Sequence, residues 1–431
     1  MAEFPRIETL AKCPYVFIET LNPFNPEKKM PVSRRTFMTN AALGAGLLTT
    51  SSVMAAPQQT AIAGFDDTKT DMDSGTVWQQ KFDRKIKMGL VGFGVCQFGT
   101  AFSLQNHPNV EVVAVSDLFP ERCAAMSQVA KCEKTYPSLE EMVKDDSIEA
   151  IFIATDAPSH GRHCLEVMKH GKHVATAVPA TWGHLEEADM LYEMVKSTGL
   201  TYMMFETSTF HDDLYAMRQI YNAGGFGKLI YSEGEYFHYF STPLDSYKGW
   251  RIGLPPQHYP THSNAYYICV TGGSFTEVSC MGNRGIVPTF MPENNIYMNP
   301  FGSEIALFRT NEGGMARMTV AWDTPGIGGE TGRVSGQKGA WWNRPFSGLA
   351  ESNELVNTLN LKKPPLPPTV DPGGHGGSHG YLGHEFVMAI LEKRKPLVNI
   401  AWALNLTVSG IVAHQSALKD GELLKIPQYA F

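Results

Sequence analysis

Short apolar runs alternate with helix-like stretches between residues 84 and 206. The runs cover residues 85–91, 110–116, 150–155, 171–176 and 203–206. Runs of this length, separated by amphipathic segments, are typical of strand–helix–strand units around a buried parallel sheet. The pattern therefore predicts a doubly wound sheet of about 120 residues.

A glycine-rich turn follows the first of these runs. It carries Gly92, Phe93, Gly94 and Val95, and the second run ends in Asp117, 23 residues after Gly94. Such a turn lets a pyrophosphate approach the backbone at a helix N-terminus, and an acid at this distance binds a ribose. The turn predicts NAD, because a carboxylate at Asp117 would repel the 2′-phosphate of NADP. Gln97 replaces the third glycine of the usual pattern, and similar turns also occur without nucleotides.

The first 56 residues are expected to be a leader. Arg34 and Arg35 precede a mildly apolar segment, and Ala55 and Ala56 end it. Two arginines, a short apolar segment and small residues at a cleavage point are typical of a twin-arginine export signal. We therefore expect an exported, periplasmic protein, with Met30 as an alternative start. The apolar segment is too short for a stable membrane span.

Composition narrows the class of protein. The 431 residues are 43% hydrophobic and 18% charged, which excludes a disordered, collagen-like or coiled-coil chain. The net charge of −7 gives no sign of the excess of Lys and Arg that is typical of nucleic-acid-binding proteins. The cysteines after the leader form no C-x-x-C pair, so we expect buried free thiols, with a Cys123–Cys132 disulfide as the alternative.

Residues 151–180 combine an Ile-Ala-Thr motif at 153–155 with His160, a Gly-Lys-His-Val motif at 171–174 and Pro179. This combination resembles the glucose–fructose oxidoreductase/inositol dehydrogenase/MocA family. The resemblance implies an α/β fold, with a Rossmann dinucleotide-binding domain at 84–205. A C-terminal α/β domain at 206–431 would follow, with an open, mainly antiparallel sheet that holds a sugar-like substrate against the nicotinamide.

Later motifs resemble a narrower group, the NAD-dependent N-acetylgalactosaminidases of glycoside hydrolase family 109. They lie at residues 203–206, 225–229, 234–238, 259–262 and 374–377. This resemblance implies that Tyr259 and His262 lie at the substrate and the nicotinamide. The expected cofactor-binding set adds Thr155, Asp156, His160, Pro179, Glu206 and Thr207 to Asp117 and the glycine turn.

The chain departs from both patterns before Pro179. Oxidoreductases of the family have Glu-Lys where this chain has Ala177 and Val178, and the hydrolases keep the Glu. A lysine-assisted proton transfer is therefore not expected, and the base must come from elsewhere. Glu206 ends the last apolar run, where it could orient the nicotinamide ribose or cap a helix.

Oxidation of a sugar hydroxyl needs a group that takes the hydroxyl proton. His262 and Tyr259 are three residues apart near an expected helix start, so both can face one cleft, although either could be a core or capping group. His238 and Tyr236 alternate on an expected strand, whose shared face is either a substrate wall or solvated. We take His262, Tyr259 and His238 as catalytic candidates.

The expected substrate-binding set contains Tyr236, Trp250, Arg251, Tyr259, His262 and His375. Trp250 could stack on a sugar ring and Arg251 could bind an acidic or hydroxyl group, with structural packing as the alternative for both. The stretch 373–379 is expected to be a loop that delivers His375 or His379 to the cleft. No metal is expected, because two histidines without a nearby cysteine or carboxylate cluster make a poor site.

These observations predict an exported NAD-dependent enzyme that acts on a sugar or glycoside by hydride transfer. In a glycosidase version, oxidation at C3 acidifies the C2 proton, the aglycone is eliminated, water adds and re-reduction restores NAD. A simple sugar dehydrogenase and a non-catalytic, NAD-holding sugar sensor are the alternatives. The stiff segment 362–368 could pack on a second copy, so a homo-oligomer is possible on this pattern.

Overall fold

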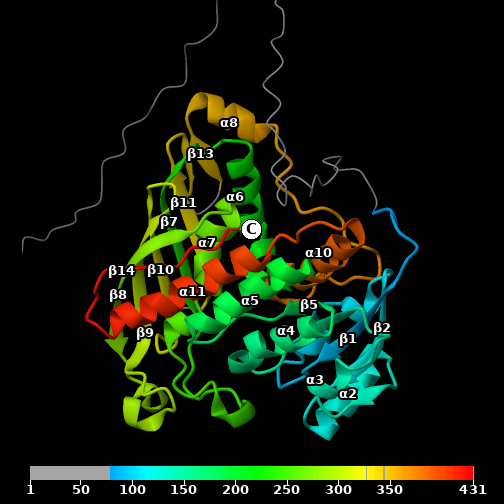
Figure 1. The fold of residues 1–431 in the computed structure, drawn as a ribbon. Coiled ribbons are helices and arrows are strands. Elements are labelled where there is room, and N and C mark those ends of the chain that lie inside the picture. Colours follow the sequence, from blue (N-terminus) through cyan, green and yellow to red (C-terminus); the bar gives the residue numbers. More distant parts are fainter. Residues whose placement is uncertain (1–77, 327, 343–344, 431) are drawn as a thin grey trace, which may run out of the picture. The chain divides into compact units, whose positions relative to one another are not determined.

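The computed structural model describes residues 78–326, 328–342 and 345–430. The predicted leader and twin-arginine signal, residues 1–56, lie outside these residues. The described part contains two sheets with helices packed against them (Figure 1). None of the helices in this part is both long and apolar enough to cross a membrane.

The first sheet has six parallel strands in the order β3-β2-β1-β4-β5-β6. The strands are β1 (Ile86–Val91), β2 (Val110–Ser116), β3 (Thr135–Tyr136), β4 (Ala150–Ile153), β5 (His173–Thr176) and β6 (Tyr202–Met204). All four residues of β4 are buried, because helices cover both faces of a parallel sheet. This is the predicted doubly wound sheet, and its order reverses beside β1, where such folds bind dinucleotides.

The helices of this first part are α2 (Pro120–Ala130), α4 (His160–Lys169) and α5 (Leu185–Thr198), with shorter turns α1 (Phe98–Ala101), η1 (Leu104–Asn106), α3 (Leu139–Met142) and η2 (Ala157–Ser159). The helix after the glycine turn is short. Ser103 has a left-handed backbone with φ of 56°, which ends α1 and separates it from η1. Gly383 packs against the carbonyl oxygen of Phe102 at this break.

The second sheet has eight strands in the order β13-β12-β11-β7-β10-β9-β8-β14. They are β7 (Leu229–Phe237), β8 (Phe275–Arg284), β9 (Phe301–Thr310), β10 (Met315–Ala321), β11 (Gly329–Gly336), β12 (Gly339–Trp341), β13 (Phe346–Gly348) and β14 (Leu424–Lys425). Only the β7–β10 pair is parallel among these described strands. The sheet is therefore mainly antiparallel, as predicted. Burial alternates along β9, so one face of the sheet is covered and the other open.

The helices of this second part include α6 (Asp212–Asn222), α7 (Thr261–Thr271), α8 (Ala350–Asn357), α9 (Gly374–Gly377), α10 (His379–Glu392) and α11 (Ile400–Ala417). The 3-10 turns are η3 (Thr207–Phe210), η4 (Tyr247–Gly249), η5 (Pro256–His258), η6 (Pro288–Phe290) and η7 (Pro292–Asn294). Helix α7 packs on β7, and α11 contacts both β8 and α5 of the first part (Figure 1). The two sheets are thus joined through α11, which positions α7 beside the end of the first sheet.

The cysteines resolve one open alternative, and the proline-rich segment has partners within its own chain. Cys123 and Cys132 are both free thiols and both buried, so the alternative disulfide is wrong. Lys363 donates hydrogen bonds to the carbonyl oxygens of Phe210 and Gly377, and Tyr381 donates to that of Pro364. This segment therefore packs on its own chain at these residues.

Candidate active site

The glycine turn opens into a cavity of about 310 Å³. The first part of the chain and the stretch 245–251, which follows β7, line this cavity. Among its lining residues are Gly92, Phe93, Gly94, Val95, Asp117, Phe119, Thr155, Asp156, Tyr247, Trp250 and Arg251. A cavity at the strand-order reversal, with a glycine turn on its floor, suits a dinucleotide. The structure thus brings most of the predicted cofactor-binding residues together.

Gly92 and Gly99 explain how the turn works without a third glycine at residue 97. Gly92 has φ of +88°, and a Cβ there would lie 2.4 Å from the carbonyl oxygen of Ala154. A Cβ at Gly99 would lie 2.5 Å from the carbonyl oxygen of Gly92. Gly99 therefore provides the close helix–strand packing that the third glycine usually provides. Gln97 adopts a left-handed backbone within the turn.

The Asp117 carboxylate holds the turn from the end of β2. Its Oδ2 accepts hydrogen bonds from the backbone N–H groups of Phe93 and Gly94, at 2.8 and 3.3 Å. Its Oδ1 accepts one from Phe119 at 2.9 Å. A carboxylate has further acceptor sites, so Asp117 can also accept from ribose hydroxyls. The turn and this acid together fit the ribose and pyrophosphate of NAD.

Replacing Asp117 with Ala is expected to weaken NAD binding by about 10- to 100-fold. Hydrogen bonds to a charged group contribute roughly 1.5–3 kcal/mol, and the turn also loses its anchor. Fluorescence titration with NADH measures the change, and Asp146→Ala, an exposed acid on the same domain, is the matched control. Unchanged affinity in Asp117→Ala would contradict the ribose assignment.

A buried acid–histidine pair lies where the two parts of the chain meet. Glu206 follows β6, and its Oε1 accepts hydrogen bonds from Ser208 N–H at 2.9 Å and from His262 Nδ1 at 2.8 Å. His262 lies in the first turn of α7. The side chains of Glu206 and His262 are 0% and 4% exposed. Glu206 therefore caps η3, as one alternative predicted, and also orients His262.

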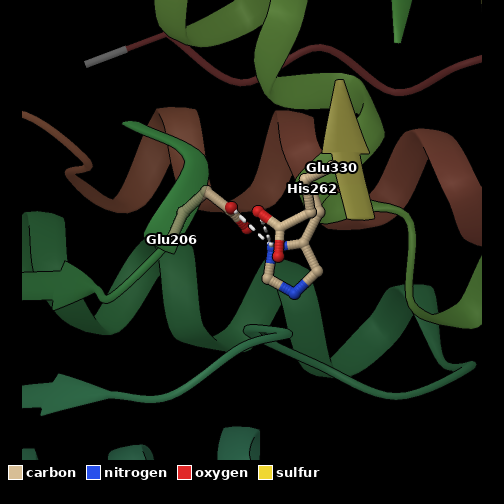
Figure 2. Close-up of side chains that lie close together, drawn as sticks. All are labelled: Glu206, His262 and Glu330. Carbon is tan, nitrogen blue, oxygen red and sulfur yellow. Dashed lines mark hydrogen bonds and ion pairs between the residues drawn. The ribbon is translucent and has the colours of Figure 1, made fainter. Parts of the chain in front are cut away.

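A second carboxylate, that of Glu330 on β11, faces the same nitrogen (Figure 2). Glu330 Oε2 lies 3.7 Å from His262 Nδ1 and 3.5 Å from His211 Nε2. Ser208 Oγ donates a hydrogen bond to this oxygen at 2.5 Å. Glu330, Ser208 and His211 were not predicted from the sequence. No motif marks them, and the strand pairing alone brings Glu330 to the site.

The two carboxylates set the protonation of His262. Burial would lower its pKa, but the charges of Glu206 and Glu330 outweigh burial and raise the pKa to about 9. Burial would raise the pKa of Glu206, but His262 keeps it below its ordinary value. His262 is thus mainly cationic at neutral pH, and Glu206 is ionised.

This pairing predicts that stability falls as the pH rises. The pKa of His262 is about 9 in the folded chain and about 6.5 when unfolded. Its stabilisation is therefore complete below about pH 6.5 and is lost as the pH rises through about 9, with a loss of about 3 kcal/mol. Urea unfolding between pH 6 and 9.5 measures it. The fall should flatten in His262→Gln, and an equally steep fall there would contradict the assignment.

The three side chains could also hold a metal ion, because their donor atoms lie within 4.8 Å of one another. The 2.8 Å separation of Nδ1 and Oε1 is that of a hydrogen bond between an N–H and a carboxylate. An Nδ1–H donated to Glu206 leaves no lone pair there for a metal. The geometry therefore favours an oriented imidazole whose Nε2, which points away from both carboxylates in Figure 2, is the reactive nitrogen.

Aromatic side chains surround this imidazole. Tyr236 meets the ring of His262 edge-on at 4.7 Å between centroids, and Tyr259 lies 5.6 Å away. Burial raises the pKa of Tyr259 to about 12, so Tyr259 keeps its hydroxyl proton at neutral pH. His238 lies one residue beyond β7, 6.3 Å from Tyr236. The predicted catalytic and substrate residues on β7 and α7 are therefore neighbours.

Two predicted substrate residues lie in the cofactor cavity instead. Trp250 is buried edge-on against Trp182 at 5.5 Å, and the guanidinium of Arg251 stacks on Trp250. Both line the cavity of the glycine turn. The packing alternative therefore describes Trp250, whose indole has little free face for a sugar.

The remaining predicted residues have structural partners. His160 is buried, with its ring nitrogens 2.8 Å from the Pro179 carbonyl oxygen and 3.2 Å from that of Thr155. Thr207 Oγ1 lies 3.4 Å from His262 Nδ1. His375 Nδ1 lies 2.8 Å from His379 Nε2. His160 thus ties Thr155 to Pro179, while Thr207 belongs with the acid–histidine pair.

Comparisons with known proteins agree with this architecture. Residues 86–206 match the model of the oxidoreductase family with an NAD-binding Rossmann fold, the Gfo/Idh/MocA family. A glycosyl hydrolase family 109 protein of Stenotrophomonas maltophilia (strain K279a) is 24% identical over 414 residues, covering 80% of this chain and 89% of the relative. Glycosyl hydrolase family 109 protein 1 of Bacteroides fragilis (strain YCH46) is 26% identical over 193 residues, so this chain spans only 41% of that relative's length.

Solved structures show the same fold. A levoglucosan dehydrogenase in complex with NADH and levoglucosan has a TM-score of 0.64 at 18% identity, covering 80% of this chain and all of that one. A scyllo-inositol dehydrogenase from Lactobacillus casei with bound NAD(H) and scyllo-inositol has a TM-score of 0.61 at 14% identity, covering 79% and 99%. The predicted fold class and the predicted cofactor, NAD, are confirmed. Residues 86–206 of this chain thus match the Gfo/Idh/MocA oxidoreductase family, with its NAD-binding Rossmann fold.

Proposed function

We propose that this chain is an exported NAD-dependent enzyme that transfers hydride between NAD and a carbon of a sugar or glycoside. The observation that carries the proposal is the buried Glu206–His262 pair, in a chain whose first domain is an NAD-binding Rossmann fold. The relatives named glycosyl hydrolases and the sugar dehydrogenases of the same fold support a sugar as substrate. The paired arginines Arg34 and Arg35 support export through the twin-arginine route, and self-association remains a prediction.

The residues of this chain account for the movement of the proton. Oxidation of an alcohol releases a hydride, which bound NAD accepts, and a proton. Donation of Nδ1–H to Glu206 fixes the tautomer of neutral His262, so that Nε2 can take the hydroxyl proton. Because the pKa of His262 is about 9, the proton-accepting form grows as the pH rises towards 9. In the reductive direction the cation donates the same proton.

We further propose a specific reaction, the glycosidase cycle. The relatives' names support it, as does Val178, which leaves no lysine for the dehydrogenase pattern, while Ala177 departs from the hydrolase pattern as well. Oxidation at C3 makes the C2 proton acidic, and its removal expels the aglycone. Water then adds, and the C3 ketone takes the hydride back. Each turnover restores NAD, which suits an exported enzyme.

A panel of nitrophenyl glycosides, assayed with and without added NAD, tests the proposal. Aglycone release with deuterium uptake at C2 and no net NADH supports the glycosidase cycle. NADH formed in proportion to oxidised sugar, without cleavage, supports a simple dehydrogenase. Binding of sugar and NAD with neither reaction would reject both enzymes in favour of a sensor.

A further inference from the structure

If His262 takes the hydroxyl proton, as the proposed function requires, this proton must then leave a buried side chain. His262 is only 4% exposed, and each oxidation leaves a proton on its Nε2. The other ring nitrogen, Nδ1, faces Glu206 and Glu330. An imidazole that gains a proton at one nitrogen can release one from the other. The carboxylates beside Nδ1 are therefore the groups that can receive it.

Of these two carboxylates, that of Glu330 connects the buried His262 with a more exposed side chain. Glu206 is 0% exposed, and its hydrogen-bonded oxygen is held by Ser208 N–H and His262. Glu330 is 8% exposed and lies 3.5 Å from His211 Nε2, whose side chain is 15% exposed. Exposure therefore rises at each step from His262 through Glu330 to His211.

We propose that Glu330 and His211 form a proton relay that connects His262 with the solvent. Glu330 Oε2 lies between His262 Nδ1, at 3.7 Å, and His211 Nε2, at 3.5 Å. Each gap closes to hydrogen-bond length with a movement of about 1 Å. His211 Nε2 makes no hydrogen bond with any described residue, so it is free to accept the proton. Ser208 Oγ holds the carboxylate in place from the other side.

The relay conserves protons at each step. As the sugar O–H bond breaks, an Nε2–H bond forms on His262 and its Nδ1–H bond breaks. The proton binds Glu330 Oε2 and then His211 Nε2, and His211 releases a proton from Nδ1 to water. Re-reduction of the C3 ketone runs the relay in reverse: Nε2–H passes to the C3 oxygen, and a proton returns from His211 through Glu330 to Nδ1, which restores the starting tautomer. Glu206 stays ionised throughout and keeps the imidazole oriented.

The glycine-rich loop at 373–377 leaves room beside this relay. A Cβ at Gly376 would lie 3.0 Å from Cδ2 of His211, so a side chain there would press on the ring. Gly376 has φ of +65°, which also favours glycine. Glycine at residue 376 thus lets this segment pass close to the His211 ring. The charged and titratable groups that act on His262, Glu330 or their neighbours here are Glu206, His211, Tyr236, His238, Arg251, Tyr259, His375 and His379.

Glu330→Gln and His211→Ala test the relay in the full chain, with Glu235→Gln on β7 as the matched control. We expect kcat to fall about tenfold in both variants, and high imidazole buffer to restore it in His211→Ala. The solvent deuterium isotope effect on kcat should rise in both. In the wild-type chain the Glu235 carboxylate accepts a hydrogen bond from Arg317, away from the relay. Glu235→Gln should therefore keep the wild-type kcat and solvent isotope effect.

A titration of nitrogen-15-labelled histidine, which needs no turnover, gives a second readout. The pKa of His262 should fall towards its ordinary value in Glu330→Gln and stay near that of the wild type in Glu235→Gln. Unchanged kcat in both relay variants, a loss that imidazole does not restore, or an unmoved His262 titration would each overturn the relay. Stoichiometric metal in the purified chain, lost in Glu330→Gln, would overturn it too. A wild-type chain without turnover would refute the proposed function, and the titration would still decide whether Glu330 acts on His262.

Discussion

Replacing His262 with Gln is expected to lower kcat by about 10²- to 10⁴-fold, the usual contribution of a general acid or base. Glutamine keeps a polar side chain of similar length in the first turn of α7, but it cannot exchange a proton. The NAD cavity is lined by other residues, so NADH affinity should stay within about twofold of the wild type. Initial rates on the best glycoside of the panel and an NADH titration measure the two effects.

The matched control is His170→Gln, which replaces a histidine at the end of α4 whose Nδ1 lies 2.9 Å from the Glu166 carbonyl oxygen and 3.7 Å from the Glu166 carboxylate. It should keep wild-type turnover. If His262→Gln also keeps wild-type turnover, the proton is handled elsewhere, and Tyr259 becomes the candidate. A loss of NADH binding together with turnover would indicate misfolding rather than missing chemistry, and circular dichroism separates the two.

The parallel sheet could be predicted from sequence because the residues that specify each strand and turn lie close together along the chain. Buried strands such as 150–153 are continuous apolar runs, and the glycine turn and Asp117 stand at fixed distances along one strand–helix–strand unit. A nearby residue also explains how the turn tolerates Gln97 in place of the third glycine. Gly99 makes the contact with the Gly92 carbonyl that a glycine at residue 97 was expected to make.

The acid–histidine pair could be predicted only in part because it is assembled from distant segments. His262 was found through its motif, but its partner Glu206 lies 56 residues earlier and was assigned to the cofactor. Glu330 is 122 residues from Ser208, to which it bonds, and its strand follows a glycine-rich stretch with no chemical signature. Only the pairing of β11 with β7 brings Glu330 towards α7. The two alternatives for Trp250 could not be separated for the same reason, since its partner Trp182 comes from another element.

Replacing Gly234 with Ala is expected to lower both stability and activity, because β7 packs closely under α7. A Cβ at Gly234 would lie 1.9 Å from the carbonyl oxygen of Ser263 and 2.7 Å from its carbonyl carbon. The backbone of α7 cannot yield as a flexible side chain would, so the first turn of the helix must move. Overpacking of this kind costs about 1–3 kcal/mol or more.

The displaced turn carries His262, so activity should fall further than stability alone explains. A shift of about 1 Å in a reacting group costs roughly 10²-fold in rate. We expect Gly234→Ala to unfold at lower urea concentration and, while still folded, to lose about 10²-fold in kcat. Gly328→Ala is the matched control, because a Cβ there meets only the Phe237 carbonyl oxygen at 3.8 Å. A folded Gly234→Ala chain with wild-type kcat would show that the position of α7 does not limit the chemistry. It would contradict the claim that the packing of β7 against α7 positions His262.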